Sequence, residues 1–252
     1  MNVLALEFPP IDHLTRWSEF GPLGLNKVGL IYIFATVATL TLFIVAGSKK
    51  QMVPRGIQNI AESSIDFVRN SIIMQTMGPD GLGYLPFLAT LFFFIFFSNI
   101  TEVIPGVQFP ANARFGIPVV LALLVWAVYW IVGFIKQGPL HYLKNSTIPP
   151  GVPKAILPLV ALIEFLQILI VRPFSQAVRL FANMLAGHLI LVTFGVICAA
   201  LWAASITIVI LPFSFALLVF LTAFEVLVSF LQAFIFTILT AVYIGSSMHP
   251  DH

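Results

Sequence analysis

Long apolar runs dominate the pattern of hydrophobic and polar positions along the chain. Three of them, at residues 28–46, 85–104 and 115–135, are close to the ~20 residues with which a helix crosses ~30 Å of hydrocarbon. Two longer apolar segments follow at residues 155–201 and 206–245. The pattern predicts an all-α polytopic membrane protein with about five membrane-inserted helices.

The segment at residues 155–201 permits two interpretations. Hydropathy alone divides it into two spans around a loop at residues 172–179. Four polar side chains instead form one helical stripe, at i, i+4, i+7 and i+11, that runs through the supposed loop: Arg172, Gln176, Arg179 and Asn183. The stripe favours one long helix, kinked at most by Pro173.

The last two apolar segments are too long to cross a bilayer upright. The part of 206–245 that follows Pro212 alone measures ~48 Å as a helix, so it must tilt well beyond the ~20° average. We therefore predict that 155–201 and 206–245 form a steeply tilted hairpin, with its turn near Trp202.

Residues 56–74 show the periodicity of an amphipathic helix. One face carries six apolar residues: Ile57, Ile60, Ala61, Ile65, Val68 and Ile72. Glu62, Asp66 and Arg69 lie elsewhere on the helix. This division of apolar and charged residues predicts a helix that lies along the membrane surface.

The distribution of Lys and Arg predicts the orientation of the chain, taken as one membrane domain over residues 1–252. With five spans, seven basic residues fall on one side: Lys49, Lys50, Arg55, Arg69, Lys136, Lys144 and Lys154. Three fall on the other side: Arg16, Lys27 and Arg114. The positive-inside rule then places residues 1–27 outside the cytoplasm and the C-terminus inside.

Composition supports a membrane protein and excludes several other classes. The chain is 60% hydrophobic and 9% charged, whereas soluble domains have about 25% charged residues. Basic residues are scattered, so a nucleic-acid partner is not expected. The single cysteine, Cys198, has no partner for a disulfide or a metal site. We find no GxxxxGK[ST], HExxH or GxSxG motif, so we expect no cofactor, and any ATP chemistry belongs to another chain.

Three ionisable residues at membrane depth are the main functional candidates: Arg179, His188 and Glu225. Each buried charge at a helix centre costs ~2.5–3.5 kcal/mol on insertion scales, so function is the default explanation. The alternative for Arg179 is a side chain that snorkels to the interface, and the alternative for His188 is an ordinary buried histidine. Nine residues separate them, which places His188 on the opposite side of the helix from Arg179.

Glu225 favours the functional explanation, because it belongs to a polar stripe on an otherwise uncharged helix. The stripe continues through four residues: Ser229, Gln232, Thr240 and Tyr243. A Glu and a His on neighbouring helices can form a proton relay. Glu102, at the outer end of its span, is either part of the same aqueous route or an ordinary interfacial acid. Glu164 and Gln167, toward the inner end of the long helix, are weaker candidates for an exit route.

Two sequence elements resemble subunit a of F-type ATP synthases. The run RPFSQAVRLFANMLAGHL at residues 172–189 is similar to the signature of that family, and LQAFIFTILTAVY at residues 231–243 is similar to its final helix. Together with the order of the spans, the likeness covers nearly the whole chain.

The resemblance implies roles for particular residues. Arg179 would be the essential arginine, with Asn183 and Gln232 as its polar neighbours. His188 and Glu225 would hold an imidazole and an acid that some members carry in exchanged positions. Glu102 matches a position that is often Asp.

The resemblance also implies a mechanism and partners. Two offset half-channels would pass protons to and from carboxyls on a rotating subunit c ring, with this chain as a non-catalytic stator subunit beside subunit b or other peripheral stalk subunits. The membrane would be a bacterial inner (plasma) membrane, or alternatively the mitochondrial inner membrane. A proton-coupled secondary transporter is the main competing function, but we find none of its internal repeats.

Overall fold

The computed structural model describes residues 26–48, 56–104, 106–148, 152–153, 155–203 and 209–248. Within these ranges the regular structure is entirely helical, with no strand. Five helices are long and apolar enough to cross a membrane: Lys27–Gly47, Gly78–Ile100, Gly116–Gln137, Leu157–Trp202 and Leu211–Met248. The prediction of an all-α polytopic membrane protein is confirmed.

The first three spans are α2 (Lys27–Ser48), α5 (Leu85–Ile100) and α6 (Gly116–Gln137). The packed core of the bundle is formed by α5, α6 and the two long helices that follow, and α2 packs against α5 from outside it. Phenylalanines of α5 fill the centre, where Phe92 and Phe93 meet edge to face with ring centroids 5.1 Å apart. Edge-to-face pairs of this kind add to the stabilisation that burial provides. The core therefore lies around α5, which contacts both α2 and α10 (Leu211–Met248).

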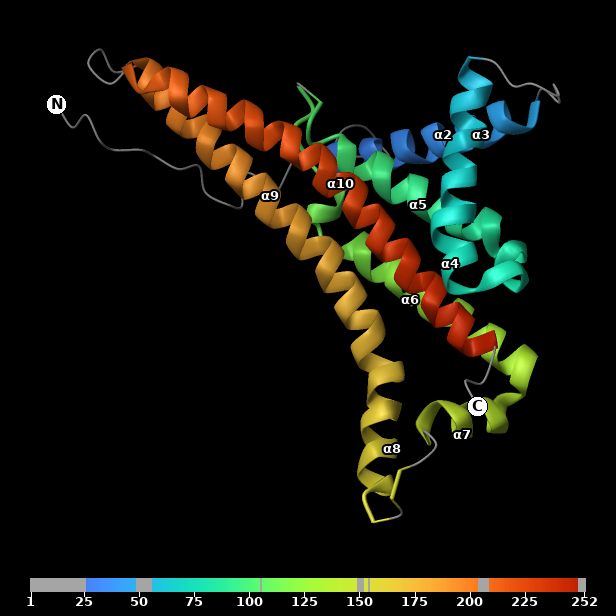
Figure 1. Cartoon of the computed structure of the whole chain (residues 1–252). Helices are drawn as coiled ribbons and strands as arrows, with labels where there is room; N and C mark the ends of the chain where they lie inside the picture. The colour runs from blue at the N-terminus through green and yellow to red at the C-terminus, as the bar shows by residue number, and fades with distance from the viewer. Residues whose placement is uncertain are drawn as a thin grey trace.

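The segment after residue 155 forms one bent helix rather than two spans. It consists of α8 (Leu157–Leu166), the π-helical turn η4 (Gln167–Val171) and α9 (Arg172–Ala203). Proline at 173 has no N–H and its ring crowds the preceding turn, which a wider turn relieves. The N–H of Arg172 accordingly bonds to the carbonyl of Gln167, five residues back. Figure 1 shows the resulting bend between α8 and α9.

The two longest helices, α9 and α10, lie side by side over much of their length (Figure 1). The 38 residues of α10 measure about 57 Å at ~1.5 Å per residue, so the helix must tilt strongly to stay within ~30 Å of hydrocarbon. Trp202, near which we predicted the hairpin turn, is 74% exposed, and residues 204–208 lie outside the described part of the chain.

The predicted surface helix begins as α3 (Ile57–Val68), which continues through the π-helical turn η1 (Arg69–Ile73) and α4 (Met74–Thr76). Figure 1 shows α3 running across α2 rather than alongside it. The apolar face is not buried as a unit, because Ile57 and Ile60 are 74% and 67% exposed. Ala61, Val68 and Ile72 face the bundle instead.

Short elements connect the spans at both ends of the bundle. The 3₁₀ turn η2 (Gly78–Tyr84) leads into α5, and η3 (Ala111–Ala113) precedes α6. The helix α7 (Pro139–Thr147) packs against α6 and α8. The predicted outer segment 1–27 falls almost entirely on residues that the structure does not describe, as does most of the proline-rich stretch 149–154.

Candidate functional site

Arg179 lies on α9, where a side chain from α10 fixes its backbone. Gln232 donates a hydrogen bond from Nε2 to the carbonyl oxygen of Arg179 at 2.8 Å. Its other amide atom, Oε1, accepts a bond of 2.9 Å from Nδ2 of Asn183. Gln232 is 2% exposed, whereas Asn183 is exposed, so the two bonds lie at the edge of the packed region. The two helices are therefore held in a defined register at the position of the arginine.

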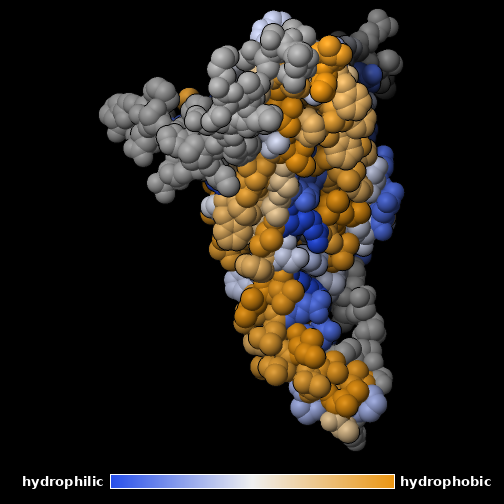
Figure 2. Space-filling model, turned by 90° about the vertical axis from the view of Figure 1, so that its left-hand side faces the viewer, coloured by the Kyte–Doolittle hydropathy of each residue, from blue (hydrophilic) through white to orange (hydrophobic). Residues whose placement is uncertain are grey.

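The guanidinium of Arg179 has no carboxylate partner among the residues that the structure describes. It is half-buried, and Ser175, Ala182 and Ala186 are exposed around it on the same side of α9. Figure 2 shows polar side chains gathered in the middle of an otherwise hydrophobic face of the molecule. An unpaired cation surrounded by apolar surface requires an anion from elsewhere.

Further pairs join α9 and α10 beyond Arg179. Gln176 is buried and donates from Nε2 to the carbonyl of Phe236 at 3.1 Å and to Oγ1 of Thr240 at 3.0 Å. Arg172 lies over the ring of Tyr243, with its guanidinium carbon 5.0 Å from the ring centroid. Arg172 is thus engaged in a cation–π contact with a residue of the neighbouring helix.

His188 lies on the opposite side of α9 from Arg179, where its ring is close to the carboxyl of Glu102. Its Nδ1 lies 3.7 Å from Oε1 of Glu102, and its ring packs edge to face against Phe109 with centroids 5.3 Å apart. His188 is 5% exposed and Glu102 is 2% exposed. The two groups are thus buried within ion-pair distance but too far apart for a direct hydrogen bond.

Glu225 approaches the same cluster from α10. It is buried, and its carboxyl lies against Gly187, where a Cβ atom would be only 2.5 Å from Oε1 and 2.7 Å from Oε2. A side chain larger than glycine at this crossing therefore requires the Glu225 carboxyl to move from this position. Because Gly187 precedes His188, the acid and the imidazole stand at the same level of the bundle.

A polar network anchors the loop that carries Glu102. Thr101 donates from Oγ1 to the carbonyl of Phe109 at 3.0 Å. Asn112 donates from Nδ2 to Ser98 Oγ and to Asn99 Oδ1, at 2.7 Å each, and accepts from the Tyr32 hydroxyl at 3.1 Å. These bonds tie the loop to α2 and α5, which fixes Glu102 and Phe109 against α9.

A cavity of about 220 Å³ adjoins this cluster. It is lined by Glu102, Val103, Gln108, His188, Leu191, Val192, Gly195, Leu218 and Thr222. Buried oxygens nearby have no hydrogen-bond donor in the protein, namely both carboxyl oxygens of Glu102, Oε2 of Glu225 and Oγ of Ser229. The cavity has room for waters beside Glu102 and His188, which can supply such donors.

The exit candidates are not drawn into either cluster. Glu164 is half-buried on α8, and Gln167 is exposed at the start of η4. The described residues give the Glu164 carboxyl no hydrogen-bond or ion-pair partner. In the described part of the chain, no group of His, Cys, Asp and Glu is suited to a metal ion.

The structure therefore sorts the candidates into two clusters on opposite sides of α9. Arg179, Asn183 and Gln232 form one, and His188, Glu102 and Glu225 form the other. The sequence did not single out Gly187 or the anchoring role of Asn112. Neither has a local signal in the sequence, because each is defined by a contact with a distant helix.

Comparison with known proteins identifies the family of the chain. The family model described as "ATP synthase A chain" matches residues 29–245. The ATP synthase subunit a of Frankia alni is 41% identical over 248 residues, which cover 94% of this chain and 84% of the relative. That of Rhodococcus erythropolis is 41% identical, with 92% and 85% covered, and that of Rhodopseudomonas palustris strain BisB5 is 41% identical, with 95% and 96% covered. This multi-pass membrane chain belongs to the ATP synthase A chain family.

Proposed function

We propose that this chain is the proton-conducting stator subunit of a bacterial F-type ATP synthase and that Arg179 faces the carboxyls of a subunit c ring. One observation carries the proposal: Gln232 fixes the backbone of Arg179, while the half-buried guanidinium has no carboxylate partner among the described residues. Membership of the ATP synthase A chain family removes the secondary-transporter alternative.

The cluster of Glu102, His188 and Glu225 supplies the outer half-channel in this proposal. Protons enter through the 220 Å³ cavity, which both Glu102 and His188 line. They pass to Glu225 and then along its stripe on α10, where Ser229 and Gln232 are also buried. Gln232 contacts the Arg179 backbone, so the stripe ends at the level of the ring.

Arg179 separates the two half-channels by electrostatics. At ~4 Å and an effective dielectric constant near 20, it attracts a carboxylate by about 4 kcal/mol, so a ring carboxyl that faces it releases its proton. The same charge repels a proton moving directly between the half-channels. Protons then travel with the ring and leave toward the inside, a route for which we retain Glu164 and Gln167 as weaker candidates.

The proposed function implies particular partner subunits and a particular membrane for this chain. A c ring would cover the open face of α9 and α10, and subunit b or other stalk subunits would hold the bundle still. The membrane would be the bacterial plasma membrane, with residues 1–27 outside and the C-terminus inside. Cysteines placed at Asn2 and His252 should then react from opposite sides, and reaction from the same side would contradict the orientation.

The experiment compares two arginine-to-lysine variants on the same helix. Reconstituted complexes carrying Arg179→Lys should assemble but lose most ATP-driven acidification of vesicles, because lysine loses its proton when desolvated and lacks the permanently charged planar fork. Arg172→Lys is the control, since a lysine retains the cation–π contact with Tyr243. Near wild-type pumping by assembled Arg179→Lys would overturn the proposal.

A further inference from the structure

Gln108, in the loop between α5 and α6, has an unusual backbone conformation. Its φ is +42°, and in the described part of the chain it is the only residue other than glycine with a positive φ. Few residues with a side chain adopt this left-handed conformation, because the side chain crowds the backbone. Gly106, two residues earlier, has a φ of +88° without such crowding. The loop therefore has a strained glutamine at a position that glycine would occupy without strain.

The neighbours of Gln108 impose this conformation. Phe109 is fully buried, its ring packs against the ring of His188, and its carbonyl accepts a hydrogen bond from Thr101 at 3.0 Å. Val107, on the other side, packs against the buried cluster that α2 forms with this loop. Because the residues before and after it are held against the protein interior, the backbone turns at Gln108 and its side chain is left exposed.

The side chain of Gln108 lines the cavity of about 220 Å³ beside Glu102 and His188. Of the described residues that line this cavity, Gln108 alone is exposed, whereas Glu102 and His188 are buried. Gln108 therefore marks the mouth of the cavity. Its amide, which can donate and accept, has no hydrogen-bond partner among the described residues. Both carboxyl oxygens of Glu102, on the inner wall, lack a donor.

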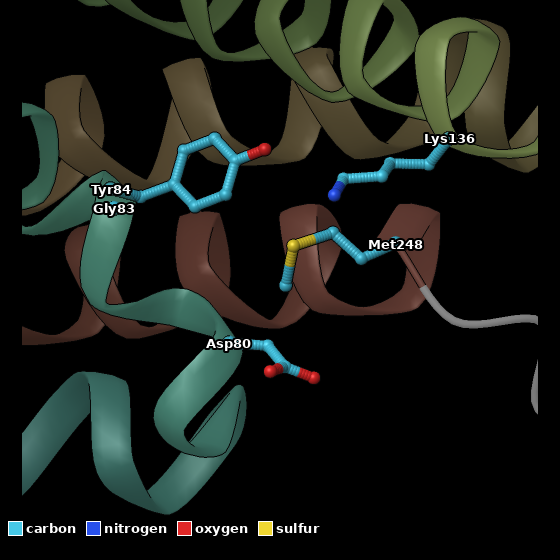
Figure 3. A pocket seen from close by; sticks show the side chains of 5 residues that line it. All are labelled: Asp80, Gly83, Tyr84, Lys136 and Met248. Carbon is cyan, nitrogen blue, oxygen red and sulfur yellow. The ribbon is translucent and has the colours of Figure 1, made fainter.

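A second pocket, at the other end of the bundle, has a different lining. It measures about 480 Å³ and is lined by Asp80, Gly83, Tyr84, Lys136 and Met248, none of which lies on the route proposed for protons. Figure 3 shows the side chains of Tyr84 and Lys136 directed into it. A lysine at the mouth of a proton route would repel an arriving proton, and a carboxylate would retain it. The neutral amide of Gln108 does neither.

We propose that Gln108 is a positioning residue for proton entry, whose amide holds the outermost of the waters through which protons reach Glu102. The inference rests on the function proposed above. A hydronium ion at the mouth gives one proton to this water, which passes one of its own protons inward, and the Glu102 carboxylate becomes a neutral carboxyl. Each water is regenerated, and the amide itself is never protonated.

The test measures the initial rate of ATP synthesis by the reconstituted complex, because an imposed proton gradient then drives protons in through the outer half-channel. Gln108→Leu retains the volume and the strained backbone but lacks the amide, so synthesis should slow about fivefold, as expected for the loss of one hydrogen bond. Gln108→Gly adopts the same backbone without strain and should slow synthesis by the same factor. Gln108→Asn retains an amide and tolerates a positive φ, so it should retain at least about half of the rate.

Two further variants separate the amide from a general effect of packing. Tyr84→Phe removes a polar group from the pocket in Figure 3, away from the proton route, and should synthesise ATP at the wild-type rate. Gln108→Lys places a charge at the mouth and should be slower than Gln108→Leu at low salt. This additional loss should shrink in ~1 M salt, where charges are screened beyond ~3 Å.

The outcomes distinguish this inference from the proposed function. If Arg179→Lys is inactive but Gln108→Leu and Gln108→Gly synthesise ATP at the wild-type rate, only the role of Gln108 is wrong. A normal rate in Gln108→Gly with a loss in Gln108→Leu would also overturn that role, since the leucine would merely block the mouth. A rate in Gln108→Asn as low as that in Gln108→Leu would show that the amide is not what matters.

Discussion

The two sides of α9 differ in how completely this chain satisfies its own polar groups. On one side, Glu102, His188 and Glu225 are buried together, and a hydrogen-bonded loop closes over them. On the other side, Arg179 stands on an open apolar face without a carboxylate among the described residues. The first side is built within the subunit, whereas in the function proposed above the second is completed by the c ring.

The two sides should therefore respond differently to substitutions that change side-chain volume and to substitutions that change charge. The closed side depends on close packing between α9 and α10, so small changes of volume disturb it. The open side depends on charge and on helix register, and its neighbours tolerate changes of volume until the ring is bound. Substitutions that distinguish volume from charge therefore test whether the two sides work as described.

The largest effect is expected at Gly187. Gly187→Ala places a Cβ 2.5 Å from the Glu225 carboxyl, and overpacking of this kind costs ~1–3 kcal/mol. Because either the helices separate or the acid moves, ATP-driven proton uptake should fall at least about tenfold. Vesicle acidification by the assembled complex measures it.

Two variants make the Gly187 result specific. Gly195→Ala, on the same helix and beside the same cavity, has nothing within 4 Å of the new Cβ and should pump normally. Combining Gly187→Ala with Glu225→Asp shortens the acid and should restore part of the loss. Normal pumping by Gly187→Ala would show that the crossing is looser than the structure indicates.

Glu225→Gln should slow proton uptake several-fold, because the amide keeps the shape but cannot carry the proton onward. The exchange of His188→Glu with Glu225→His should restore part of the rate, since the acid and the imidazole stand at the same level of α9 and α10. The initial rate of acidification measures both. Simple addition of the two single losses would contradict a relay.

Gln232→Leu should reduce pumping about threefold while assembly is retained. It removes the bonds to Arg179 and Asn183, each worth ~1 kcal/mol, and leaves the charge of Arg179 in place. Gln232→Glu remains polar and still accepts from Asn183, but it cannot donate to the Arg179 carbonyl. Comparing it with Gln232→Leu shows whether pumping depends on the bond that fixes the helix register or only on a polar side chain at this position. If Gln232→Leu were as inactive as Arg179→Lys, the glutamine would act on protons directly.

The smallest effect is expected at Tyr129, which lies away from both sides of α9. Its hydroxyl donates to the carbonyl of Ile168 in the π-helical turn at 2.7 Å. Tyr129→Phe removes one bond of ~1 kcal/mol and should lower the melting temperature by about 2–4 °C with pumping unchanged. Thermal melting and acidification rates together check this, and a loss of pumping would mean that the bend positions Arg179.

The spans and the long helix followed from the sequence because their signals are local. A run of ~20 apolar residues has few alternatives in a bilayer, and the stripe from Arg172 to Asn183 already had helical spacing. The amphipathic helix also followed from a local signal, the periodicity of residues 56–74, and the structure forms it as α3 and the π-helical turn at Arg69–Ile73. Ile57 and Ile60 at its start are exposed, whereas Ala61, Val68 and Ile72 are buried.

The sequence predicted which residues belong to the candidate site, but not which of their side chains contact one another. Burial of charge in apolar helices identified Arg179, His188 and Glu225. The sequence suggested a direct pair of His188 and Glu225, whereas the structure places Glu102 nearest to the imidazole, at 3.7 Å. Contacts between helices depend on crossing angles and on small residues such as Gly187, which a one-dimensional pattern does not contain.

The π-helical turn at Gln167–Val171 determines where the long helix can lose a residue without rotating the side chains that follow. A π-helical turn is equivalent to one extra residue inserted into an α-helix, which the wider turn absorbs. Deletion of one residue there returns the turn to α-helical form and leaves the angular phase of α9 relative to α8 unchanged. Deletion of one residue between Arg179 and His188 rotates one candidate side relative to the other by about 100°. The bent helix of α8 and α9 therefore has a position where its length is adjustable, before the stretch where it is not.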